Sequence, residues 1–341
     1  MYNKFYNLNK KPFQLSADPD FFFGSKIHSR ALAYMNYGLT QGEGFVVVTG
    51  EPGLGKTMLV RQLVHNLNTD NIVIGVMVTS HVDADETIRI VAATLGIRYE
   101  GDDKSITLEQ IKDYFTQQAQ EGKRVLLIVD EAQHLPKGSL EELRILADFV
   151  VEDVLPFQVF LVGQGELAQT LYAPDMDQFR QRIVATFQLK ALTEEETKVY
   201  ILFRLEKAGW DHKPEFEDGV FQDIYIFTEG IPRKINTFCD RLLLYGYLEE
   251  IELITTKDVE KVVNEVLEES LTVPDESSVA MNIPVIQSPN NSLSINSSAE
   301  ERISNLEKNL ATMENILNKE RALLRKAILI QLDMEDVFDK D

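Results

Sequence analysis

The sequence is poor in cysteine. Among its 341 residues there is one cysteine, Cys239, so no disulfide can form within the chain and a zinc site built from several cysteines is excluded. This composition is typical of a reducing compartment such as the cytosol. The five histidines are scattered, without the spacing of metal ligands or of a serine–histidine–aspartate arrangement, so we assign none of them a catalytic role.

Long hydrophobic runs are also missing. No stretch approaches the roughly 18 consecutive apolar residues that a membrane-spanning helix needs, and the first residues lack the apolar region of a signal peptide. We therefore expect a cytoplasmic protein without a membrane span, whose association with the inner membrane would be peripheral and would depend on partners.

Positive charge is scarce relative to negative charge. The chain has 34 lysines and arginines against 55 aspartates and glutamates, which gives a net charge of -21. Such a balance opposes indiscriminate binding to nucleic acid or to anionic lipid, although it is compatible with a local basic patch. Hydrophobic residues make up 44% of the chain, an ordinary fraction for a globular protein with a real core.

What the sequence does contain is a phosphate-binding pattern at residues 50–57, which read GEPGLGKT and match G-x-x-x-x-G-K-[ST]. An apolar, β-branched run at 45–49 precedes it and predicts a buried parallel strand, and the run at 58–64 has helical periodicity. Glycines let successive backbone N–H groups point at an anion, and the helix adds the positive end of its dipole. The predicted ATP-binding residues are Gly50, Glu51, Pro52, Gly53, Leu54, Gly55, Lys56, Thr57 and Met58.

Within this pattern, Lys56 is expected to contact the β- and γ-phosphates, and the Thr57 hydroxyl to bind Mg²⁺. A second apolar strand is predicted at residues 125–131 and ends in Asp130 and Glu131. Strand ends in an open α/β sheet face the crevice where ligands bind, so these carboxylates should meet the phosphate loop. Asp130 is the predicted Mg²⁺ ligand, and Glu131 is predicted to orient the attacking water. By itself, an Asp-Glu pair would equally be an ordinary acidic strand end.

Three arginines are candidates for contacting phosphate. Arg180 and Arg182 are predicted to present an arginine finger to the γ-phosphate of a neighbouring subunit, where positive charge stabilises the transition state. A solvated basic turn is the alternative for this pair. Arg233 follows Gly-Ile-Pro at the start of a predicted helix, and it is expected to reach the nucleotide of its own chain.

The order of predicted elements indicates an α/β fold. Apolar strands at 45–49, 72–79, 125–131 and 157–162 alternate with helices, which predicts a parallel sheet covered on both faces. Capping boxes are predicted at Ser139 with Glu142 and at Thr193 with Glu196. The predicted organisation is a nucleotide-binding domain at 1–192 that includes an aromatic segment at 1–25, an all-helical lid at 193–270, a flexible linker at 271–299, and a C-terminal helix at 300–341, a candidate coiled coil with an acidic tail.

The aromatic segment at residues 1–25 has two interpretations. It is rich in phenylalanine, tyrosine and proline, which is typical of irregular chain packed on a core. An apolar segment just ahead of the strand of the phosphate loop would also suit the wall of an adenine site. The two interpretations are compatible.

Taken together, these motifs resemble those of AAA+ ATPases, and in particular those of the ExeA/GspA type of the general secretion pathway. The likeness covers about residues 1–270 and is strongest to the subgroup associated with exosortase (PEP-CTERM) and exopolysaccharide gene clusters. The motifs that carry it are Lys11-Pro12-Phe13, Gly42-Glu43-Gly44-Phe45, the phosphate loop, Val129-Asp130-Glu131-Ala132-Gln133, Leu161-Val162-Gly163-Gln164, Arg180-Gln181-Arg182 and Gly230-Ile231-Pro232-Arg233.

The resemblance implies roles for individual residues. It implies that Lys56 and Thr57 act as Walker A and that Asp130 and Glu131 act as Walker B. The remaining implied roles are Arg233 as sensor 2, Gln164 at or near the sensor-1 position, Arg182 as the favoured finger and Arg180 as its reserve. The implied activity is hydrolysis of ATP with Mg²⁺.

The resemblance also implies a biological role, with two alternatives. It implies an ATP-dependent homo-oligomer, a ring or filament, that acts as an assembly or switch ATPase in secretion or envelope exopolysaccharide export. A secretion or export partner is expected at the predicted helix at 300–341, which lies outside the resemblance. The same core resembles transposition regulators of the TnsC/TniB type that assemble on DNA, which the charge balance disfavours. A nucleotide-gated scaffold whose terminal helix recruits a partner is the other alternative.

Overall fold

The computed structural model describes residues 1–67, 70–78, 83–98 and 103–272. Its elements are α1 (Tyr2–Phe5), η1 (Pro19–Phe21), α2 (Lys26–Gln41), β1 (Phe45–Thr49), α3 (Lys56–Asn66), β2 (Ile72–Val78), α4 (Ala84–Thr94), α5 (Lys104–Gln120), β3 (Arg124–Asp130), η2 (Ala132–His134), α6 (Lys137–Ala147), β4 (Phe157–Gly163), α7 (Gly165–Leu171), η3 (Pro174–Met176), α8 (Asp177–Arg180), β5 (Ile183–Gln188), α9 (Glu194–Lys207), β6 (Glu215–Phe216), α10 (Val220–Thr228), α11 (Pro232–Leu248), β7 (Leu253–Ile254) and α12 (Thr256–Thr272).

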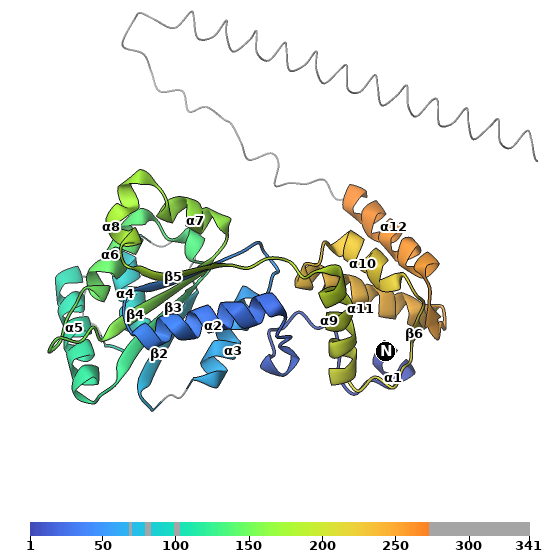
Figure 1. Cartoon of the computed structure of the whole chain (residues 1–341), viewed down its shortest axis with the longest axis horizontal. Helices are drawn as coiled ribbons and strands as arrows, with labels where there is room; N and C mark the ends of the chain where they lie inside the picture. Colours follow the sequence, from blue (N-terminus) through green and yellow to red (C-terminus); the bar gives the residue numbers. More distant parts are fainter. Residues whose placement is uncertain (68–69, 79–82, 99–102, 273–341) are drawn as a thin grey trace, which may run out of the picture. The chain divides into compact units, whose positions relative to one another are not determined.

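A five-stranded sheet lies at the centre of the first part of the chain (Figure 1). Its strand order is β2-β3-β4-β1-β5, and every pairing within it is parallel. Strand β4 lies between β1 and β3, with Thr49 paired to Gly163 and Val129 paired to Leu161. The carboxyl ends of β1, β4 and β3 therefore lie side by side at one edge of the sheet.

Helices cover both faces of this sheet, as predicted. Successive residues of a strand point to opposite faces, so Val46 and Val48 pack with α2 and α3, whereas Phe45 and Val47 pack with the side of α4 to α7. The central strands are buried along almost their whole length. This double covering explains why these strands read in the sequence as uninterrupted apolar runs.

The four predicted strands are confirmed, with ends that differ by one residue at most. Strand β5 is not among the predicted strands, the last of which is at 157–162, so Arg180 and Arg182 are expected to follow the whole sheet. They precede β5 instead. This strand lies at an edge of the sheet and is only partly buried, so it lacks the continuous apolar run that revealed the others.

One of the two predicted capping boxes is confirmed. The Thr193 hydroxyl accepts a hydrogen bond from the Glu196 backbone N–H, and the Glu196 carboxylate accepts one from the Thr193 N–H. The prediction at Ser139 is wrong because the N-cap of α6 is Pro136, three residues earlier, and the helix begins at Lys137. The Ser139 hydroxyl is buried and hydrogen bonded to the Thr87 hydroxyl at 2.8 Å, which ties α6 to α4.

Between Glu194 and Thr272 the elements are the helices α9 to α12, joined by turns, and a two-residue parallel pairing of β6 with β7 that was not predicted. Four side chains of the N-terminal aromatic segment belong to the hydrophobic core of this helical part: Tyr2, Tyr6, Leu8 and Phe13. The segment that the sequence groups with the nucleotide-binding domain thus packs against the helices of the predicted lid.

Apart from its first two residues, which close α12, the predicted linker at 271–299 lies outside the described residues, as does the predicted helix at 300–341. Within the described ranges, every helix is too short or too polar to cross a lipid bilayer.

A glycine in α2 allows this helix to lie close to the sheet, and this generates a stability prediction. A Cβ on Gly38 would come within 2.2 Å of Val46 Cγ2, and Val46 is buried in β1. We expect Gly38→Ala to lower the free energy of unfolding by about 1–3 kcal/mol, because overpacking outweighs the helix propensity of alanine. Chemical denaturation measures the change.

The matched control is Gly165→Ala, at the start of α7, where an added Cβ would meet nothing within 4 Å. This variant should keep the stability of the parent protein. Equal stability of the two variants would contradict the close approach of α2 to β1.

Candidate nucleotide-binding site

The phosphate loop connects β1 to α3 with the backbone that the sequence predicts. Gly53 and Gly55 have φ angles of 85° and 92°, in the left-handed region that residues with a Cβ rarely adopt. Gly55 is the residue from which α3 begins, so the first N–H groups of the helix face the same space as the loop. This backbone forms a concave surface suited to an anion.

Lys56 is buried, with its ammonium group held by the loop itself. Lys56 Nζ donates to the carbonyl oxygens of Gly50 at 2.8 Å and Glu51 at 3.0 Å. Burial lowers the pKa of Lys56, while the nearby carboxylates of Glu131 and Asp130 act in the opposite direction. An anionic phosphate on the loop would add a further counter-charge to this ammonium group.

The Thr57 hydroxyl meets the carboxylate that the sequence predicts for it. Thr57 Oγ1 donates to Asp130 Oδ2 at 2.7 Å, and Asp130 is buried at the end of β3. Hydroxyl and carboxylate oxygens are ligands that Mg²⁺ accepts, so this pair fits the predicted metal. In the described ranges no cluster of three or more His, Cys, Asp or Glu side chains could hold a metal, so Mg²⁺ would also need phosphate oxygens and water.

Glu131 is held by two glutamine side chains. Its backbone has a φ of 55°, an uncommon conformation for a residue with a Cβ. Glu131 Oε2 accepts hydrogen bonds from Gln133 Nε2 at 2.7 Å and from Gln164 Nε2 at 3.4 Å. Gln133 Oε1 in turn accepts from the Gln164 backbone N–H at 3.0 Å.

These contacts keep Glu131 ionised. The hydrogen bond from Gln133 lowers the pKa of Glu131, partial burial opposes it, and Gln164 and Lys56 act in the same direction as Gln133. A carboxylate that is charged and fixed in place is suited to accept a hydrogen bond from a water molecule. The sequence indicates Gln133 only as part of the motif at residues 129–133, and its contact with Glu131 is not among the predictions.

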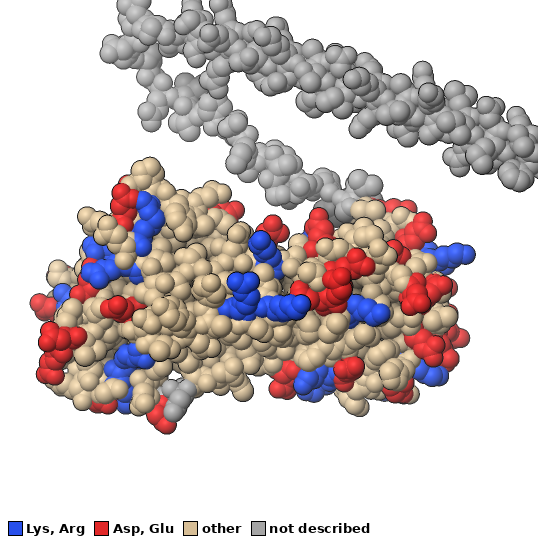
Figure 2. Space-filling view, viewed as in Figure 1, with Lys and Arg blue, Asp and Glu red and all other residues tan. Residues whose placement is uncertain are grey.

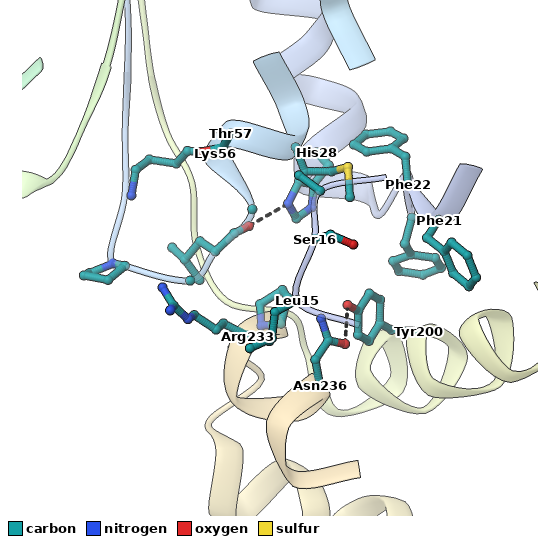
Figure 3. Close-up of a pocket in the computed structure, with 18 of the residues that line it drawn as sticks. Leu15, Ser16, Phe21, Phe22, His28, Lys56, Thr57, Tyr200, Arg233 and Asn236 are labelled. Atoms are coloured by element: carbon teal, nitrogen blue, oxygen red, sulfur yellow. Dashed lines mark hydrogen bonds between the residues drawn. The ribbon is translucent and has the colours of Figure 1, made fainter. Parts of the chain in front are cut away.

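A pocket of about 400 Å³ brings most of the predicted site residues together (Figure 3). Those that line it are Pro52, Gly53, Leu54, Gly55, Lys56, Thr57, Met58, Glu131, Gln164 and Arg233. Gly50, Glu51 and Asp130 do not line it but are bonded to Lys56 or Thr57. The Arg233 N–H donates to the Gly53 carbonyl at 3.1 Å, so the start of α11 contacts the phosphate loop.

Arg180 and Arg182 do not line this pocket. Arg180 Nη1 donates to the carbonyl oxygens of Leu171 at 3.1 Å and Ala173 at 2.7 Å, and the guanidinium is also paired with Asp177. The Arg182 side chain is 48% exposed and is paired with Asp148 at 2.8 Å. Arg180 therefore supports the local backbone, whereas Arg182 is the more accessible of the two.

The sequence did not reveal two further parts of the pocket. His28 is buried, its Nε2 lies 2.9 Å from the Leu54 carbonyl oxygen, and its Nδ1 lies 2.7 Å from Ser25 Oγ. A carbonyl oxygen can only accept, so Nε2 carries the proton and Nδ1 accepts from the Ser25 hydroxyl. His28 thus joins the start of α2 to the phosphate loop.

Arg204 of α9 is the other part. It is 3% exposed, donates to the carbonyl oxygens of Pro12 at 2.6 Å and Gln14 at 3.1 Å, and lies over the Phe21 ring. Residues of this N-terminal stretch, including Leu15, Phe21 and Phe22, line the pocket. Their position agrees with the interpretation of the segment as a wall of the nucleotide site.

Comparison with known proteins places this geometry in a family context. Residues 39–171 match the family model described as an AAA domain. Over 267 residues the chain is 35% identical to General secretion pathway protein A of Aeromonas hydrophila. The aligned stretch covers 78% of this chain and 48% of that protein. The chain therefore spans about half the length of this relative.

Solved structures share the fold at low sequence identity. The ORC2 protein of Aeropyrum pernix, in ADPNP–ADP complexes, matches with a TM-score of 0.58 and 15% identity over 75% of this chain and 72% of that one. Cdc6p of Pyrobaculum aerophilum matches with a TM-score of 0.58 and 16% identity over 77% and 74%. Both likenesses establish the fold, which is that of a P-loop AAA domain.

The buried histidine generates a prediction on pH. Burial lowers the pKa of His28. The hydrogen bond to the Leu54 carbonyl and the charge of Glu196 raise it, but burial has the larger effect. The unfolded chain therefore binds a proton at His28 more readily than the folded chain does. As the pH falls below about 6.5, the pKa of an unfolded histidine, the folded state loses the stability that His28 provides at higher pH.

We expect His28→Gln, which keeps a donor near the Leu54 carbonyl, to reduce this pH dependence. Free energies of unfolding at pH 7.5 and pH 5.5 should differ less in the variant than in the parent protein. An identical pH dependence in both proteins would show that His28 is not buried as described.

Proposed function

The chain carries an AAA domain and is related to General secretion pathway protein A, and from this premise we propose that it binds and hydrolyses ATP with Mg²⁺. The observation that carries the proposal is the hydrogen bond of 2.7 Å between Thr57 Oγ1 and Asp130 Oδ2 at the mouth of the phosphate loop. It brings together the loop for phosphate and the carboxylate for the metal, which ATP hydrolysis requires in one place.

Each residue of the site has a distinct task in this proposal. The loop N–H groups and Lys56 bind the phosphates, and Thr57 and Asp130 hold the metal. Mg²⁺, when bound, neutralises charge on the β- and γ-phosphate oxygens. Glu131, fixed by Gln133, orients the attacking water.

Two polar residues near the γ-phosphate complete the site. Gln164 donates to Glu131 and directly follows β4, the strand that lies between β1 and β3, so it is placed to respond to the γ-phosphate. Arg233 contacts the loop through its backbone, and its side chain extends toward the side of the pocket where Lys56 lies (Figure 3). We assign Arg233 to binding phosphate of its own chain and linking α11 to the nucleotide.

Self-association belongs to the same proposal. Arg182 lies outside the pocket of its own chain and is half exposed, as an arginine that serves a neighbouring subunit would be. We propose an ATP-dependent homo-oligomer in which Arg182 is the finger. Arg180 is the weaker candidate because its guanidinium is bound to backbone carbonyl oxygens.

For the cellular process, we propose an assembly or switch role in secretion or envelope exopolysaccharide export, peripheral to the inner membrane, with a partner at residues 300–341. The relationship to General secretion pathway protein A supports this assignment. The DNA-associated alternative would need a basic band, and on the face that Figure 2 displays, lysines and arginines are interspersed with acidic residues. The net charge of -21 also disfavours that alternative.

Substitution of the two central residues tests the activity. Lys56→Ala should abolish ATP-induced thermal stabilisation and turnover, because the phosphates lose their buried counter-charge. Glu131→Gln should keep ATP binding but lower turnover by about 10²-fold or more, the usual contribution of a positioned base. Phosphate release and melting temperature with and without ATP measure these effects.

In the native host, Lys56→Ala should also block export of protein or polysaccharide.

The matched control for Glu131→Gln is Glu260→Gln, an exposed residue of α12 distant from the pocket in the sequence and absent from its lining. It should behave as the parent protein does. Equal turnover in the parent, Lys56→Ala and Glu131→Gln would rule out ATP hydrolysis at this site.

Mixing of inactive variants tests the finger. Arg182→Ala should lower turnover by about 10³-fold, the effect of a lost arginine finger. The melting temperature should not change, because the ion pair of Arg182 with Asp148 is partly exposed and contributes little to stability. Lys56→Ala subunits retain Arg182, whereas Arg182→Ala subunits retain the phosphate loop. A mixture of the two should therefore be more active than either alone.

The Arg180→Ala variant separates support of the backbone from catalysis. It should lower the melting temperature, because two carbonyl oxygens lose their donor. If the mixture of Lys56→Ala and Arg182→Ala is no more active than its components, Arg182 does not act across subunits.

A further inference from the structure

Three polar side chains form a line of hydrogen bonds along the helical wall of the pocket. Arg204 Nη1 donates to Tyr200 Oη at 3.0 Å, and Tyr200 Oη is bonded to Asn236 Oδ1 at 2.8 Å. Tyr200 and Arg204 come from α9, and Asn236 comes from α11. All three line the pocket, and all three are more than nine-tenths buried.

The direction of each hydrogen bond follows from chemistry. A guanidinium can only donate, so the Tyr200 oxygen accepts from Arg204. Burial raises the pKa of Tyr200, so its hydroxyl keeps its proton. That proton is donated to the Asn236 amide, where only an oxygen can accept it, and this fixes which way the amide is turned.

The Asn236 amide nitrogen therefore points away from Tyr200. In Figure 3 it faces the side of the pocket on which Leu15 and Ser16 lie. Within the described ranges no acceptor is hydrogen bonded to Asn236 Nδ2, although the residue is only 7% exposed. The amide nitrogen thus has an unused donor on the pocket side of α11, where a bound ligand can supply the acceptor.

The position of Asn236 indicates which part of the ligand this is. Arg233 contacts the phosphate loop at Gly53, and Asn236 is three residues later on the same side of α11, a rise of about 4.5 Å along the helix. It is thus about one turn farther from the phosphate loop, in a pocket whose lining also includes the apolar side chains of Leu15 and Phe22. A flat base suits these surroundings better than a charged group does.

We infer that Asn236 reads the base of the nucleotide, donating a hydrogen bond from Nδ2 to a ring nitrogen of adenine. Tyr200 and Arg204 are positioning residues that prevent the amide from turning over. This inference rests on the proposed function, since it concerns the same pocket. It adds that a purine ring nitrogen, and not the exocyclic amino group, is the recognised atom, because the amide oxygen is engaged by Tyr200.

Equilibrium binding of the full chain to ATP and to 1-deaza-, 3-deaza- and 7-deaza-ATP tests this assignment. Each analogue replaces one ring nitrogen by C–H and so removes one acceptor. In the parent protein, one of the three analogues should bind about tenfold more weakly than ATP, the effect of one hydrogen bond. In Asn236→Ala, ATP itself should bind about tenfold more weakly, and that analogue should bind as ATP does.

Two further variants separate recognition from structure. Asn36→Ala, at an exposed position of α2, should bind all four nucleotides as the parent does. Tyr200→Phe keeps the ring but frees the amide to turn, so it should reduce the discrimination between ATP and the sensitive analogue with a smaller loss of ATP affinity than Asn236→Ala.

Two results would overturn the inference while leaving the proposed function intact: ATP binding in which no deaza substitution matters, or discrimination that persists undiminished in Asn236→Ala. Failure of the parent protein to bind any of the four nucleotides would be a different result, and it would overturn the proposed function as well.

Discussion

The hydrogen bond between Thr57 and Asp130 depends on the register of three parallel strands. The two residues are 73 positions apart in the chain and are joined at 2.7 Å, because β1 and β3 both pair with β4, β1 ending level with its last residue and β3 one residue before it. A slip of one residue in either pairing would turn the side chains of that strand to the other face of the sheet. The chemistry of the site is thus determined by the packing of the core.

The end of β4 adds a second constraint. Gly163 is the last residue of this strand, and a Cβ there would come within 2.9 Å of Gln133 Oε1. The glycine leaves room for the Gln133 side-chain amide. The nitrogen of this amide donates to Glu131, and its oxygen accepts from the Gln164 backbone N–H. The Gln133 side chain therefore contacts both Glu131 and the start of α7, and it keeps Glu131 and Gln164 next to each other.

Much of this fold could be predicted from the sequence because its signals are local. The buried strands are continuous apolar runs, and the phosphate loop is a pattern of eight residues, so both are visible without any knowledge of tertiary contacts. Strand β5 is half-buried at an edge and has no such run. Ser139 matched a capping box, but α6 begins earlier, with Pro136 as its N-cap. The Ser139 hydroxyl instead forms a hydrogen bond with the Thr87 hydroxyl of α4.

The parts of the site that were missed depend on contacts between distant residues. His28 meets the phosphate loop 26 residues later, and Arg204 meets the N-terminal segment about 190 residues earlier. No spacing rule relates such pairs, since each contact exists only once the sheet and the helical part have packed. Burial is equally invisible in a chain read residue by residue, since an arginine is expected at the surface and a histidine can lie at the surface or in the core.

The buried Arg204 also ties the nucleotide site to the packing of the helical part. An arginine taken out of water is tolerated only where its donors are satisfied, and here Pro12, Gln14 and Tyr200 accept from it. The same side chain thus joins α9 to the segment that forms the apolar wall. A ligand that binds only when these walls are assembled must stabilise their assembly by its own binding free energy. For such a ligand, affinity and the packing of the helices would be two measures of one equilibrium.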